Sequence, residues 1–261
     1  MAKPYIGVTG PVTIQETKSI CKEFSNEGYS MRTPHIPMVG FLVSYKTLNR
    51  KPTNNLRYPP IDVLPDLLEA TNKQALNMIH YNSRNLDTLS YQIDQIFSKV
   101  YDLCQSLQLN IPWPPINEIK KIKEDYPEMQ IVFQASKEAI KRQTPKQIAQ
   151  GLKKYEGLLT YVLIDPSGGQ QKTFEASDTV PIYCEIKEHC PDLTVGFAGG
   201  FRGENVNSRL QEIIEQTQES DFCIDAEGGL RNKLSSRPGD DILNIEKVRN
   251  YLKGASATLI I

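Results

Sequence analysis

The sequence has 261 residues, 39% of them hydrophobic, and a formal net charge of −1. This near-neutral charge predicts no general attraction to nucleic acid or to an anionic membrane. No apolar stretch approaches the roughly 18 residues that a membrane-spanning helix needs. The length and hydrophobic content suit one domain with a large core, so we expect residues 1–261 to form a single domain.

The cysteines indicate a reducing environment. They are odd in number and form no CxxC pair, which argues against a disulfide framework or a zinc site; they are Cys21, Cys104, Cys184, Cys190 and Cys223. The chain runs from Met1 directly into a strand-like segment, and we expect no signal peptide. These features together predict a cytoplasmic protein without a metal.

Apolar segments of strand length alternate with helical patterns along the chain. The eight predicted strands are residues 5–8, 38–44, 76–81, 107–111, 130–133, 158–164, 193–198 and 222–226. Helices are predicted at residues 14–24, 61–70, 87–106, 115–125, 145–155 and 242–252. Continuous apolar runs are typical of buried parallel strands. Eight such units favour a closed (β/α)8 barrel over an open sheet, which commonly has five or six strands.

Active sites of such barrels lie at the carboxyl ends of the strands. The polar residues predicted there are Thr9, Lys46, Arg50, His80, Asn82, Asp165, Arg202, Asp225, Glu227 and Arg231. The longest irregular stretch, residues 46–60, follows the second strand and is rich in Asn, Pro and basic residues. A loop of this length in a compact domain is often a lid or a substrate loop.

Two glycine pairs follow the last two predicted strands. Gly199-Gly200 comes after residues 193–198, and Gly228-Gly229 comes after residues 222–226. We expect each pair to lead toward a helix, which would leave backbone N–H groups free to hold an anion. The loops after strands seven and eight of a (β/α)8 barrel often form a phosphate site. The pairs therefore predict a phosphate site, with a tight turn that binds nothing as the alternative.

From about residue 158 to 254 the chain resembles phosphoribosylanthranilate isomerase of the tryptophan pathway. Leu163-Ile164-Asp165, followed by a segment that starts at Gly168-Gly169, resembles that family's LLD and GGTGKTFDW. Phe197-Ala198-Gly199-Gly200-Phe201 with Glu204-Asn205-Val206 resembles its LAGGL and ENV. A weaker match upstream, Gly40-Phe41-Leu42-Val43 leading to Arg50, resembles its GFVF and SPR.

The resemblance implies an Amadori rearrangement of a small phosphorylated sugar derivative. Asp165 stands at the position of the family's general acid, and Arg50 at that of the arginine that binds the anthranilate carboxylate. Arg202 and Arg231 are candidate phosphate partners beside the two glycine pairs. We expect no cofactor, no partner other than the phosphorylated substrate, and a monomer or a homodimer.

The chain departs from the family at two positions. Ile6 stands where the family has the cysteine that acts as general base, so we expect little or no isomerisation of phosphoribosylanthranilate. Glu227 and Gly228 replace two serines of the phosphate loop, and a carboxylate there repels phosphate unless Arg202 or Arg231 compensates its charge. Because strands eight and one are neighbours in a closed barrel, Glu227 is the candidate replacement base.

Three function classes remain open. The leading one is an isomerase-like enzyme with Asp165 as general acid and the Gly199-Gly200 and Gly228-Gly229 loops as phosphate cradle. The second is a lyase or an aldolase-type barrel that uses a different base, such as Glu227, on a related phosphorylated or carboxylated substrate. The third is a ligand-binding relative without catalysis. His80 is either a buried, hydrogen-bonded histidine or a further catalytic candidate.

Overall fold

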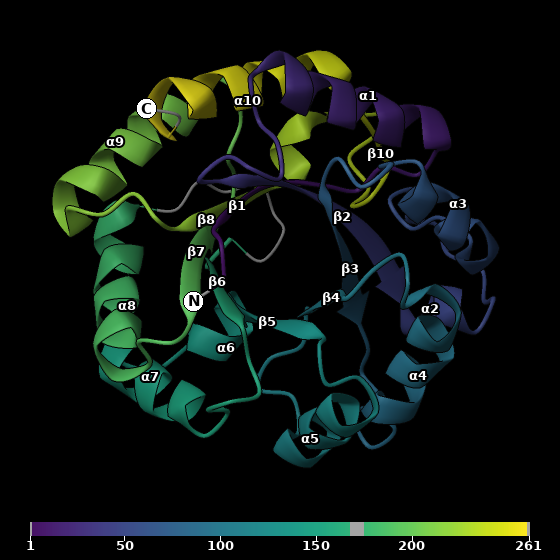
Figure 1. Cartoon of the computed structure of the whole chain (residues 1–261), viewed down its shortest axis with the longest axis horizontal. Coiled ribbons are helices and arrows are strands. Elements are labelled where there is room, and N and C mark those ends of the chain that lie inside the picture. Colours follow the sequence, from purple (N-terminus) through teal and green to yellow (C-terminus); the bar gives the residue numbers. More distant parts are fainter. Residues whose placement is uncertain (1, 168–174, 260–261) are drawn as a thin grey trace.

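The computed structural model describes residues 2–167 and 175–259, in which eight parallel strands close into a barrel (Figure 1). The strands are β1 (Tyr5–Thr9), β2 (Ile36–Ser44), β3 (Leu76–Asn82), β4 (Ser106–Leu109), β5 (Gln130–Ser136), β6 (Tyr161–Asp165), β7 (Thr194–Ala198) and β8 (Cys223–Ala226). They follow chain order around the barrel, and β1 pairs with both β2 and β8. The predicted (β/α)8 barrel is therefore confirmed, including the pairing of the first and last strands.

Helices surround the barrel (Figure 1). They are α1 (Ile14–Asn26), α2 (Tyr45–Leu48), α3 (Leu64–Glu69), α4 (Leu89–Val100), α5 (Ile116–Asp125), α6 (Lys137–Ile140), α7 (Pro145–Lys153), α8 (Ala176–His189), α9 (Val206–Thr217) and α10 (Ile245–Leu259). Capping boxes fix the starts of α1, at Thr13 and Glu16, and of α7, at Thr144 and Gln147. Within the described ranges, the helices are too short or too polar to span a membrane.

The segment after β8 differs from the sequence prediction. Gly228 and Gly229 begin the short 3₁₀ turn η2 (Gly228–Leu230), which is followed by an antiparallel hairpin of β9 (Arg231–Lys233) and β10 (Asp241–Leu243). The predicted helix at 242–252 therefore begins only at Ile245. Ile242 is exposed between two buried neighbours, which is the alternation of a strand. The predicted helix at 87–106 is also too long, because α4 ends at Val100 and Ser106 begins β4.

Side chains alternate between the inside and the outside of the barrel along each strand. Tyr5 belongs to the apolar cluster inside the barrel, together with Met38, Met78, Val132, Tyr161, Leu163 and Cys223. Ile6 belongs instead to the large cluster that includes Ile20 and Phe24 of α1. The position that the sequence analysis matched to the family's base therefore faces the helices and not the barrel interior.

This orientation gives a direct prediction for Ile6→Cys. The new thiol is expected to lie buried between β1 and the helices, where it cannot reach a ligand, so phosphoribosylanthranilate isomerisation should not increase. Thiol titration of the folded protein should count no additional reactive cysteine over the wild type, because burial suppresses the thiolate. An Ile6→Cys variant that gains both isomerase activity and a reactive thiol would contradict this orientation.

Candidate active site at the carboxyl ends of the strands

A cavity of about 610 Å³ opens at the carboxyl ends of the strands. Its walls come from the strand ends, from the loop of residues 49–60 and from the β9–β10 hairpin. A smaller cavity of about 50 Å³ adjoins it and shares the lining residues Arg57, Asn110, Gln134, Asp165 and Glu227. The smaller cavity is also lined by Leu163 of the inner cluster, so it reaches down into the barrel.

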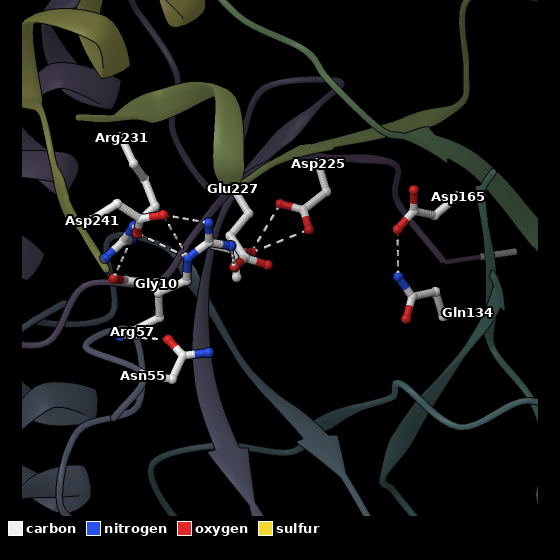
Figure 2. Close-up of polar contacts among 10 residues, drawn as sticks. Gly10, Asn55, Arg57, Gln134, Asp165, Asp225, Glu227, Arg231 and Asp241 are labelled. Carbon is white, nitrogen blue, oxygen red and sulfur yellow. Dashed lines mark hydrogen bonds and ion pairs between the residues drawn. The ribbon is translucent and has the colours of Figure 1, made fainter. Parts of the chain in front are cut away.

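Asp165 ends β6 and is buried in the wall of both cavities. Its Oδ2 accepts a hydrogen bond of 2.7 Å from Gln134 Nε2 (Figure 2). Its Oδ1 accepts from the Ser167 backbone N–H (3.1 Å) and hydroxyl (2.6 Å). Burial raises the pKa of the Asp165 carboxyl group, and the hydrogen bonds from Ser167 and Gln134 offset only part of this effect. A carboxyl group that keeps its proton to a higher pH is suited to act as an acid.

Asp225 on β8 is the second buried carboxyl group of the site. The Thr9 hydroxyl donates to both of its oxygens, at 2.9 and 3.1 Å. Burial raises the pKa of Asp225 to about 7; the Thr9 hydrogen bond opposes this rise, and the charges of Glu227 and Asp165 add to it. Figure 2 shows the Asp225 carboxyl group between Glu227 and Asp165. The sequence predicts Asp225 at a strand end and suggests no role for it, although alternation with Ile224, which packs against the helices, predicts an inward side chain.

Arg57 joins the loop of residues 49–60 to the end of the barrel. Its Nη1 donates to Glu227 Oε1 at 2.6 Å, and its Nε and Nη2 donate to the Asp241 carboxylate at 2.9 and 2.5 Å. The Leu56 N–H also donates to the Gly239 carbonyl of the hairpin at 2.9 Å. The predicted substrate loop therefore does supply a side chain to the cavity, but nothing in the sequence distinguishes Arg57 from its basic neighbours.

The three arginines predicted to bind substrate lie elsewhere. Arg231 is buried and donates to Asp241 Oδ1 (2.6 Å) and to the Gly10 carbonyl (2.9 Å). Arg202 is exposed beside Glu204, and Arg50 is exposed in an ion pair with Asp62. None of these arginines lines either of the two cavities. Among the described residues, the cation that forms an ion pair with Glu227 is Arg57.

The predicted glycine pairs do meet in the smaller cavity, which is lined by Gly199, Gly200, Gly228 and Gly229. Gly199 and Gly200 follow β7 with φ values of +114° and +71°, a conformation that favours glycine. A Cβ atom on Gly229 would lie only 2.1 Å from the Phe201 carbonyl oxygen, so the two loops can pack this closely only with glycine there. The predicted motif at residues 168–174 lies outside the described residues.

The fold and the cavity define a (β/α)8 barrel with two buried carboxyl groups of raised pKa, Asp165 and Asp225, at its carboxyl end. No protein-family model matches the sequence, and no curated protein is similar to it. Several solved structures match over nearly their whole length. Phosphoribosylanthranilate isomerase from Thermotoga maritima is 15% identical with a TM-score of 0.62, and the match covers 97% of this chain and 99% of that one.

Two further structures extend the comparison. TrpF from Jonesia denitrificans is 12% identical, with a TM-score of 0.59 and 98% of each chain covered. Tryptophan synthase subunit alpha from Legionella pneumophila is 10% identical, with a TM-score of 0.61 and coverage of 98% of this chain and 93% of that one. The predicted resemblance to phosphoribosylanthranilate isomerase thus extends to its structure, and at these identities the likeness concerns the barrel fold.

Proposed function

We propose that this barrel is an enzyme that moves a proton within a small phosphorylated sugar derivative, with Asp165 as general acid and Asp225 as general base. The observation that carries the proposal is the pair of buried carboxyl groups with raised pKa values in one cavity. Structural carboxylates that are paired with cations usually have lowered pKa values. In catalytic pairs, by contrast, burial often raises the pKa values of the carboxyl groups. A pKa of about 7 makes Asp225 a stronger base than an ordinary aspartate, which proton removal from carbon requires.

In this proposal Glu227 has a different role from the one predicted by the sequence. One of its carboxylate oxygens already accepts the 2.6 Å hydrogen bond from Arg57. Glu227 would then hold the guanidinium group at the cavity, while Asp225, deeper in the barrel, removes the proton. Two variants separate these roles. Glu227→Gln loses the carboxylate that holds Arg57 and should weaken substrate binding, whereas Asp225→Asn loses the base and should lower kcat.

The phosphate group of the substrate would lie on the two glycine pairs. β7 stands between β6 and β8 in the barrel, so Gly199 and Gly200 follow the strand that separates Asp165 from Asp225. A phosphate held there would place the carbon next to it within reach of both carboxyl groups. Arg57 lines the same cavity and supplies the positive charge that an anion needs beside three carboxylates.

Inorganic phosphate binding tests this arrangement. We expect phosphate to bind the wild type and Arg57→Met to weaken that binding at least tenfold, because the cavity then keeps its carboxylates without their cation. Arg50→Met is the matched control, since Arg50 is exposed and outside both cavities. Calorimetric titration, with a thermal melt of each variant to verify folding, makes the measurement. Equal binding by both variants would exclude Arg57 from the phosphate site.

The reaction itself is tested by incubating the protein with phosphoribosylanthranilate and with ribose 5-phosphate and identifying the products by NMR. Isomerised product from either compound supports the proposal. Carbon–carbon cleavage would favour the lyase or aldolase-type alternative, which can use the same base. Binding of both compounds without turnover would favour the relative that only binds its ligand.

A further inference from the structure

Two buried polar atoms of the smaller cavity lack a partner. His80 Nε2 and Gln108 Oε1 form no hydrogen bond with any described part of the chain, and each residue is only 2% exposed. The two residues are direct neighbours in the register of β3 and β4. Leaving a buried donor or acceptor unpaired is unfavourable, so such atoms usually have a partner that the protein itself does not provide.

The space beside His80 Nε2 is kept open by a glycine. A Cβ atom on Gly40 would lie 2.8 Å from His80 Nε2 and 2.3 Å from Thr9 Oγ1, the hydroxyl that donates to Asp225. On the neighbouring strand, Gln108 Nε2 donates to Asn110 Oδ1 at 2.9 Å, which leaves Gln108 Oε1 as a free acceptor. His80 Nε2 therefore lies close to the hydroxyl that donates to the proposed base, and Gln108 is its neighbour on β4.

The electrostatics of this end of the cavity favour a neutral ligand group. Burial lowers the pKa of His80 to about 3, so its imidazole is uncharged at neutral pH and offers one donor and one acceptor. Asp165 and Asp225 line the same cavity and repel a second anion. A hydroxyl group both donates and accepts, and therefore complements an imidazole nitrogen and an amide oxygen together.

We propose that His80 Nε2 and Gln108 Oε1 form a subsite for hydroxyl groups on the carbon chain of a phosphorylated sugar. The inference rests on the proposed function, because it takes the phosphate end of the ligand to lie on the glycine pairs that line the other part of this cavity. The ligand class is then a polyhydroxylated phosphate ester. A phosphate ester of a plain alkyl chain would leave both atoms unpaired.

Calorimetric titration with three probes tests the subsite: ribose 5-phosphate, n-pentyl phosphate and inorganic phosphate. We expect the wild type to bind ribose 5-phosphate at least tenfold more tightly than n-pentyl phosphate. His80→Phe and, as an independent variant, Gln108→Met should each reduce this preference to about twofold or less. His35→Phe is the matched control: His35 is also a buried histidine, but it bonds the Phe222 carbonyl outside both cavities, and the preference should persist.

The outcomes separate this inference from the proposed function. Phosphate binding without a preference for the sugar, or a preference that both variants retain, overturns the subsite and leaves the phosphate site standing. A preference that depends on His80, without binding of inorganic phosphate, supports the subsite and overturns the phosphate site. A crystal of the ribose 5-phosphate complex with only ordered water on both atoms also overturns the subsite. Absence of binding by every probe overturns both.

Discussion

Asp225→Asn is expected to make the protein more stable at pH 8 while lowering its turnover by about two to four powers of ten, the usual cost of losing a general base. The stability gain follows from burial, which moves the pKa of Asp225 from 3.8 to about 7. The folded protein therefore binds a proton that the unfolded chain releases between these pH values. The contribution of Asp225 to the free energy of unfolding is therefore fully present below about pH 4 and is lost as the pH rises through 7.

The size of this effect follows from the same shift. A difference of about three pKa units corresponds to about 4 kcal/mol, and relaxation around the charged group reduces this, so we expect a gain of about 2–4 kcal/mol at pH 8. The asparagine can still accept the Thr9 hydrogen bond. Urea unfolding of both proteins at pH 4 and pH 8 makes the measurement. If the free energies of unfolding of the two proteins differed by the same amount at pH 4 and pH 8, Asp225 would not titrate in this range.

Asp241→Asn is expected to destabilise the protein by about 3–5 kcal/mol at pH 7. Asp241 is 3% exposed and accepts from both Arg57 and Arg231, so its neutralisation leaves two guanidinium groups without their shared carboxylate. The matched control is Asp62→Asn, which breaks the exposed Arg50–Asp62 pair and should cost less than about 1 kcal/mol.

The pH dependence of this second variant has the opposite sign. Burial alone would raise the pKa of Asp241, but the hydrogen bonds and charges of Arg57 and Arg231 outweigh it and lower the pKa. The contribution of Asp241 is therefore present above about pH 4 and is lost as the pH falls through its lowered folded-state pKa. Urea unfolding from pH 3 to pH 7 should show the two proteins converging at the acid end. A constant difference across this range, or a loss below 1 kcal/mol at pH 7, would contradict the role given to Asp241.

Much of the fold could be predicted from the sequence because a parallel barrel is built from continuous apolar strands in a regular order. The hairpin of β9 and β10 was missed because its strands are only three residues long, too short to separate a two-residue period from a helical one. Ile6 was matched to the position of a catalytic residue by motif alone. The alternation of Tyr5, Ile6 and Gly7 along β1 assigns it to the outside.

The site was predictable where the residues follow a strand and unpredictable where they depend on long-range packing. Asp165 and the glycine pairs line the cavity, as their places after β6, β7 and β8 predicted. Arg57 could not be selected from the loop of residues 49–60, because its role depends on the distant Asp241 and Glu227. Arg231, which looked like a phosphate partner, is instead bound to Asp241 for the same reason.

The most direct test of the central claim is the exchange of the carbon-2 proton of ribose 5-phosphate with solvent deuterium, followed by NMR. If Asp225 removes a proton from a phosphorylated sugar, the wild type exchanges this proton, and Asp225→Asn slows the exchange at least a hundredfold. In the wild type the exchange rate should fall as the pH decreases below about 7, as Asp225 becomes protonated. No exchange by the wild type, or exchange that Asp225→Asn leaves unchanged, would contradict the account.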